Sequence, residues 1–155
     1  MTSLILPRLP TAPGHARRYL RPRFTAMGFS KGKIEEMLVA IGEAVTNAVV
    51  HGGPDTQVVD TDAVTVDLVI RNSDLTIAVT SPLVGWSAAP QVRADLMAES
   101  GRGFLMMQNL TDALKMRQGA EGTTVYLTWH LPRSRSGSTG ARPPLSRSRR
   151  RRRAS

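Results

Sequence analysis

Two alternating runs joined by a short polar turn are the feature that most constrains the fold of this chain. Residues 64–71 read VTVDLVIR and residues 75–80 read LTIAVT, with apolar and polar side chains alternating in both runs. Successive side chains of a strand point to opposite faces of a sheet, so each run is typical of a half-buried strand. Asn72 and Ser73 lie between the runs and favour a turn, which predicts a β-hairpin.

Three helices and one more strand are expected around this hairpin. The first helix spans about residues 11–29, where Pro22 is expected to kink or break it and Gly28 to end it. Ser30 is the expected N-cap of the second helix, which ends at Gly52. Its apolar residues recur at helical spacing, at positions 34, 37, 38, 41, 45, 48 and 49.

The third helix is expected to begin at Phe104 and to continue through TDALKM, because positions 104, 107, 110, 111 and 114 lie on or near one helical face. A turn at 119–122 then leads to the last strand, TTVYLTWHL. Its apolar face carries Val125, Leu127, Trp129 and Leu131. The predicted fold class is α+β: a two-layer sandwich of a mostly antiparallel sheet with helices on one face.

The charge of the chain is confined to its C-terminal end. The 155 residues carry a formal charge of +9, and nine of the 21 Lys and Arg residues lie in 133–155, where no acid occurs. The 12 remaining basic residues balance the 12 acids, so residues 1–132 are neutral. We therefore expect an extended lead over 1–11, one domain over 12–132 and a disordered arginine-rich tail over 133–155. The tail is interpreted either as an arm for polyanions such as nucleic acid or as a solubilising extension.

The absence of cysteine excludes disulfides and thiol chemistry and is typical of a reducing compartment. No apolar stretch approaches the roughly 20 residues that a membrane span requires. The start, MTSLILPRLP, has no charge before its short apolar run, unlike a signal peptide. These features predict a cytoplasmic protein without a membrane anchor.

A polar stripe inside the second helix contains the first candidate functional residues. Glu43, Asn47 and His51 recur every four residues, so they advance by about 40° each and fall roughly opposite the apolar face. An amide oxygen suits Mg²⁺, which takes few protein ligands and several water or phosphate oxygens. A carboxylate one turn away can act as a general base. The alternative interpretation is a solvated helix face.

Two glycine-containing segments are the other candidates. Gly101 and Gly103 precede the third helix, where backbone N–H groups can bind phosphate, and Arg102 between them can add a charge-assisted contact. The alternative is a turn before a core helix. In GTTV, residues 122–125, a threonine hydroxyl can reach the same site, although threonine is common in strands on propensity alone.

The chain resembles the GHKL or histidine-kinase-like ATPase family in three segments taken together: EAVTNAVVHG, ESGRGFLMMQNLTDAL and GTTVYLTW. The arginine-rich ARRYLR near the start adds to this resemblance. Within the family, these segments resemble the anti-sigma-factor serine/threonine kinase branch. The resemblance covers about residues 12–131 and implies the Bergerat-type ATP-binding fold, with ATP and Mg²⁺ as cofactors. It also implies a sigma factor and an anti-sigma-factor antagonist protein as partners, with a homodimer as a further possibility.

The resemblance also implies roles for single residues. Glu43 matches the general base, Asn47 the Mg²⁺ ligand, and His51 a histidine near the edge of the nucleotide. The segment from Gly101 through Arg102 and Gly103 to Phe104 matches the phosphate-binding glycine box, and residues 87–100 match the ATP lid. Thr124 matches a strand threonine that lines the adenine pocket.

The chain departs from the family pattern at the adenine end of the site. Gly85 and Trp86 fit the end of the box that follows the second hairpin strand, but Ser81 replaces its aspartate and Leu83 its first glycine. The leading hypothesis is an ATP-dependent kinase that phosphorylates the antagonist and sequesters the sigma factor. The alternatives are a degenerate, non-catalytic interaction module on the same fold and, through the tail, a nucleic-acid binder.

Overall fold

The computed structural model describes residues 1–51, 63–82, 101–119 and 122–133. In chain order, its elements are β1 (Thr2–Pro7), α1 (Ala12–Ala26), α2 (Lys31–His51), β2 (Ala63–Arg71), β3 (Asp74–Ser81), α4 (Gly101–Asn109), β4 (Ala113–Gly119) and β5 (Gly122–His130).

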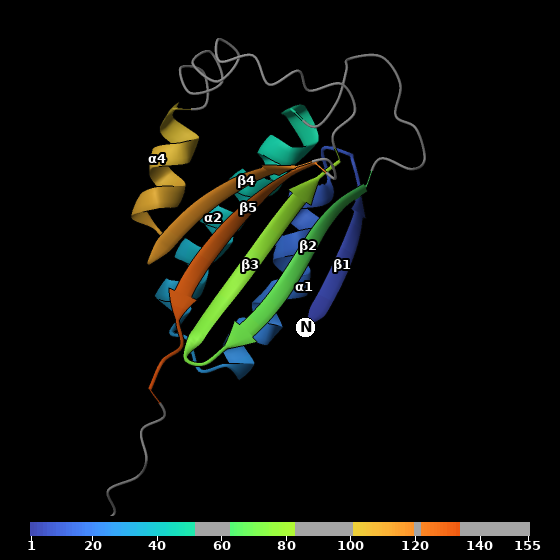
Figure 1. The fold of residues 1–155 in the computed structure, drawn as a ribbon. Coiled ribbons are helices and arrows are strands. Elements are labelled where there is room, and N and C mark those ends of the chain that lie inside the picture. Colours follow the sequence, from blue (N-terminus) through green and yellow to red (C-terminus); the bar gives the residue numbers. More distant parts are fainter. Residues whose placement is uncertain (52–62, 83–100, 120–121, 134–155) are drawn as a thin grey trace, which may run out of the picture.

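The five strands form one sheet in the order β1-β2-β3-β5-β4, and every neighbouring pair is antiparallel. Helices α1 and α2 lie against one face of this sheet, and α4 lies beside the β4 edge (Figure 1). The opposite face carries no helix among the described residues. The predicted α+β class, with helices on one face of an antiparallel sheet, is confirmed.

The hairpin lies within the sheet as its sequence predicts. β2 and β3 pair from Thr65 with Thr80 to Arg71 with Asp74, and Asn72 at the turn has a φ of 54°. Asparagine adopts this left-handed conformation more readily than most residues. The alternation therefore sets the register, with the apolar residues of both strands on the helix-side face.

The expected lead over residues 1–11 contains a strand of the sheet. β1 pairs with β2 from Thr2 with Leu68 to Pro7 with Ala63, and Leu6 is buried. β1 is an edge strand that pairs with a single neighbour, β2, and the alternation that would mark it as a strand in the sequence is weak. Its place in the sheet depends on β2, about 60 residues further along the chain.

Pro22 was expected to kink or break the first helix, and helix α1 is continuous through it, so Pro22 does not break the helix. Pro22 is exposed, while Ala16, Leu20 and Phe24 on the other side of the helix are buried. Burying these side chains stabilises the helix enough to offset the hydrogen bond that proline cannot donate. The helix ends before Gly28, whose φ is 84°, and the Lys33 N–H donates to the Ser30 hydroxyl at 3.3 Å, as expected of an N-cap.

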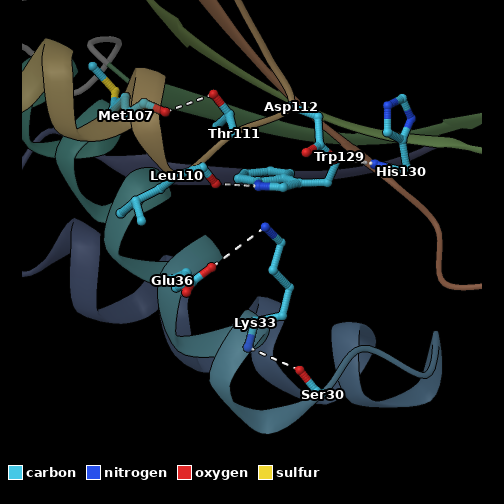
Figure 2. Close-up of polar contacts among 9 residues, drawn as sticks. All are labelled: Ser30, Lys33, Glu36, Met107, Leu110, Thr111, Asp112, Trp129 and His130. Carbon is cyan, nitrogen blue, oxygen red and sulfur yellow. Dashed lines mark hydrogen bonds and ion pairs between the residues drawn. The ribbon is translucent and has the colours of Figure 1, made fainter.

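The third predicted helix is shorter than expected. α4 ends at Asn109, and the segment expected to continue it, from Ala113, is the edge strand β4. Three hydrogen bonds hold this change of direction: two come from β5 to the segment after α4, and one joins that segment to α4 itself (Figure 2). The Trp129 indole N–H donates to the Leu110 carbonyl at 2.7 Å, the Thr111 hydroxyl to Met107 O at 2.7 Å, and the His130 N–H to Asp112 Oδ2 at 2.8 Å.

The apolar core lies between the sheet and the helices. Trp129, Phe24 and Met37 are among its largest fully buried side chains. They come from β5, α1 and α2, so the core joins both layers of the sandwich. The ends of α2 and β3 lie at the same end of this sandwich (Figure 1), where the candidate residues occur.

Candidate nucleotide site

The predicted polar stripe of α2 lies in a half-buried position. Glu43 and Asn47 are both intermediate in exposure, while Ala44 and Ala48 beside them are buried. Among the described residues, neither Glu43 nor Asn47 has a hydrogen-bond or ion-pair partner. A solvated helix face would leave both side chains exposed. The burial therefore favours the site interpretation.

Glu43 lies directly against α4, at Gly103. A Cβ placed on Gly103 would be 3.0 Å from Glu43 Oε2, closer than most real Cβ contacts. A side chain at position 103 would therefore displace the carboxylate. This contact joins two motifs that lie about 60 residues apart in the sequence, and only the packing of α2 on α4 brings them together.

The glycine box is helical in the described structure and is not a loop before the helix. The described part of α4 begins at Gly101, whereas the sequence predicted a helix start at Phe104. Backbone N–H groups at the start of a helix lack partners within the helix and can bind phosphate. Phe104 is half-buried and packs against the core, so it positions the box from the apolar side.

Ser81 is the residue predicted at the adenine end of the candidate site. It is the last residue of β3 and is buried, with 9% of its surface exposed. Its partner across the sheet is Thr123 of β5, and the next pair on the same face is Val79 with Val125, both in the core. Ser81 and Thr123 therefore lie on the helix-side face of the sheet.

Thr124 lies on the opposite face, away from the other candidates. Its hydroxyl is 2.9 Å from the Thr80 hydroxyl on the face that no described helix covers. The structure therefore does not bring Thr124 to the side on which Ser81 lies. The neighbour of Ser81 on that side, Thr123, could have been found from the sequence, because it has the same parity as Val125, Leu127 and Trp129 on the predicted apolar face.

Several predicted residues lie outside the part that the structure describes. Gly85 and the lid segment 87–100 belong to the range 83–100, and the tail belongs to 134–155. His51 is the last residue of α2 and Arg102 lies in the first turn of α4, but the side chains of both are outside the described set. Their roles stay predictions.

The donor set suits a magnesium nucleotide better than a metal held by protein alone. In the described part of the chain, no three His, Cys, Asp or Glu side chains gather into a possible metal site. Asn47 and Glu43 offer hard oxygen donors, and Gly103 leaves space beside the carboxylate where a Cβ would otherwise lie. Mg²⁺ typically takes one or two protein oxygens and completes its shell with water and phosphate oxygens, so these residues fit it.

Comparison with known families identifies the family of this chain. The model of the histidine kinase-like ATPase domain matches residues 6–129, which includes every strand and helix of the sandwich except the first residues of β1 and the last of β5. The chain belongs to the histidine kinase-like ATPase family.

Individual relatives place it near a regulatory branch of that family. It is 31% identical over 115 residues to an anti-sigma F factor of Halalkalibacterium halodurans and 30% identical over 113 residues to that of Priestia megaterium. The anti-sigma F factor of Geobacillus thermodenitrificans is 29% identical over 111 residues. Each alignment covers 67% of this chain and 74% of the relative.

A solved structure has a similar fold. The RsbU and RsbW domains of a Mycobacterium tuberculosis protein superpose with a TM-score of 0.59 at 25% identity, over 84% of this chain. The match spans 33% of that longer chain, so this chain corresponds to about a third of it. None of the described helices is long and apolar enough to cross a membrane.

Proposed function

We propose that this chain is an ATP-dependent protein serine/threonine kinase of the anti-sigma type. It phosphorylates a serine of an antagonist protein and binds a sigma factor. The observation that carries the proposal is the contact of Glu43 with Gly103, with Asn47 one turn further along α2. This contact supports a site to which a carboxylate, an amide and the start of α4 contribute. Family membership and the anti-sigma relatives support the same assignment.

Each residue has a distinct role in the proposed reaction. Bound ATP supplies the phosphoryl group, and the side-chain oxygen of Asn47 would hold Mg²⁺ beside its phosphates. The Glu43 carboxylate accepts the proton of the attacking serine hydroxyl. Gly103, in the first turn of α4, keeps space for that carboxylate, so its backbone and Glu43 approach the same point.

A groove between α1 and α2 is a candidate surface for binding a protein partner. It has a volume of about 490 Å³ and is lined by Arg17 and Arg18 of α1 and by Val39 of α2, which is 43% exposed. Arg21 donates two hydrogen bonds to Glu35 across the groove, and this hydrogen bonding lowers the pKa of the Glu35 carboxyl.

Within the described chain, Arg17 and Arg18 have no acidic partner. Two free guanidinium groups beside an exposed valine fit an acidic, partly apolar protein segment. We assign this segment to the sigma factor. The double change Arg17→Glu and Arg18→Glu is expected to weaken sigma-factor binding at least tenfold, and weakened binding of the antagonist alone would contradict the assignment.

The kinase is tested by separating nucleotide binding from phosphate transfer. Calorimetric titration of the full chain with Mg-ATP is expected to show binding, which Glu43→Gln preserves. Phosphate transfer to a candidate antagonist, or ADP formation in its absence, is expected to fall by about 10²- to 10⁴-fold in Glu43→Gln, the usual contribution of a general base.

The matched control is Glu36→Gln, because Glu36 is exposed on the same helix and pairs with Lys33 at 3.6 Å. This variant is expected to keep wild-type activity. Full activity in Glu43→Gln would remove the proposed base. ATP binding without any phosphate transfer in the wild-type chain would instead support the non-catalytic module, which the replacement of the family aspartate by Ser81 favours.

Two further predictions concern the oligomeric state and the location of the chain. A homodimer is predicted from the family resemblance alone. A cytoplasmic location is predicted from the composition alone. The arginine tail, outside the described residues, stays a candidate polyanion arm by its charge alone. Deleting 133–155 is expected to leave ATP binding unchanged.

A further inference from the structure

The resemblance implies that the base of the nucleotide lies near Ser81, whose cross-strand neighbour Thr123 offers a second hydroxyl group. Ser81 of β3 and Thr123 of β5 face each other across the sheet, on the side that α2 covers. Directly opposed residues of antiparallel strands have Cβ atoms about 4.5 to 5.5 Å apart, so both side chains border the same small volume.

Ser81 is buried at the point where β3 ends. Its exposed fraction is 9%, and its neighbour along the same face, Val79, is at 1%. A ligand group that reaches Ser81 is therefore largely removed from water. In such a place, a polar ligand group that finds no partner weakens binding strongly.

The chemistry of the two hydroxyls differs from that of a carboxylate. An ionised aspartate only accepts hydrogen bonds, so it binds an amino group and opposes a carbonyl oxygen. Adenine presents an amino group at its sixth position, whereas guanine presents a carbonyl oxygen there. A serine or threonine hydroxyl rotates and can either donate or accept.

We propose that Ser81 and Thr123 make the nucleotide site tolerant of both purines, so that the chain binds GTP alongside ATP. This inference rests on the proposed nucleotide site and adds the range of nucleotides that it takes. The hydroxyls accept a hydrogen bond from the adenine amino group, and they donate one to the guanine carbonyl oxygen. At the sixth position, neither base then leaves its polar group unpaired.

The test compares Mg-ATP and Mg-GTP binding to the full chain by calorimetry under identical conditions. The expected dissociation constants lie within about threefold of each other. Ser81→Asp is expected to introduce at least a tenfold preference for ATP, since a tenfold change corresponds to the loss of about one hydrogen bond. A wild-type preference for ATP above tenfold overturns the proposal and leaves the kinase assignment standing. Failure of both nucleotides to bind at millimolar concentration overturns both.

A second pair of variants keeps the test valid where Ser81→Asp does not fold. Thr123→Val retains the shape of the side chain and removes one hydroxyl, so it is expected to weaken ATP and GTP by a similar factor. Thr124→Val is the matched control, because it makes the same change on the opposite face of the same strand. It is expected to leave both affinities unchanged. Equal effects of the two threonine variants would contradict the assignment.

Discussion

Gly103 lies so close to Glu43 that an added methyl group would have to move the carboxylate. The Cβ of Gly103→Ala would lie 3.0 Å from Glu43 Oε2, and relief of this contact requires a shift of a few tenths of an ångström. The carboxylate ends a flexible side chain, so the shift does not require the backbone to move. The expected consequence is a misplaced general base in an otherwise intact fold.

The magnitudes separate stability from catalysis. Alanine is more favourable than glycine inside a helix by about 0.8 to 1 kcal/mol, and an off-rotamer glutamate costs about 0.5 to 1.5 kcal/mol. The free energy of unfolding is therefore expected to change by less than about 1 kcal/mol. This limit corresponds to a Tm shift smaller than about 5 °C. A misplacement of about 1 Å can cost 10²-fold in rate, so a smaller shift is expected to reduce phosphate transfer about tenfold.

Thermal unfolding and the rate of phosphate transfer at saturating Mg-ATP measure the two effects. Gly42→Ala is the matched control: it lies next to Glu43 in α2, and apart from its chain neighbours and the backbone of its own helix no described atom lies within 4 Å of its added Cβ. This control is expected to keep wild-type activity. If Gly103→Ala transfers phosphate at the wild-type rate while remaining folded, the contact with Glu43 does not position the base.

Three further predictions concern the fold. Trp129→Phe is expected to lower the free energy of unfolding by about 2 kcal/mol in denaturant titrations, because it leaves the half-buried Leu110 carbonyl without its indole donor. A loss below about 0.5 kcal/mol would contradict this. Phe24→Ala is expected to cost about 3 to 5 kcal/mol, since Phe24 is fully buried, and a change within error in the same titration would be incompatible with that burial. The hydrogen bond with Asp74 raises the pKa of His130 in the folded state above its unfolded value of about 6.5. The stabilisation by this His130–Asp74 pair is therefore complete below a pH of about 6.5 and is lost as pH rises through the higher folded pKa. In NMR titrations, Asp74→Asn is expected to lower the pKa of His130, and an unchanged value would refute the pairing.

The helix 31–51 and the hairpin 63–81 are elements that the sequence predicts clearly. Both have long, regular apolar periods that point to a single buried face. Local chemistry agrees at the cap of Ser30 and the turn at Asn72, so each element could be placed before its neighbours were known.

The segment 110–119 shows why the rest could not be placed. Leu114 fits both a helical period and an alternating one, since in β4 it pairs with Leu127 on the helix-side face. The choice between the two was made by pairing with β5 and by the hydrogen bond from Trp129 to Leu110. These contacts are absent from local sequence, and tertiary pairing routinely overrides propensity.

The sequence by itself determined the fold class, the polar stripe of α2 and the neutral domain with a charged tail, because periodicity and charge are local properties of the chain. Only the tertiary structure decided that Glu43 meets Gly103, that Thr123 rather than Thr124 faces Ser81, and that residues 2–7 complete the sheet. Each of these depends on segments far apart in the sequence. Whether two such segments come into contact depends on which of their faces are buried together, and burial is a property of the whole fold.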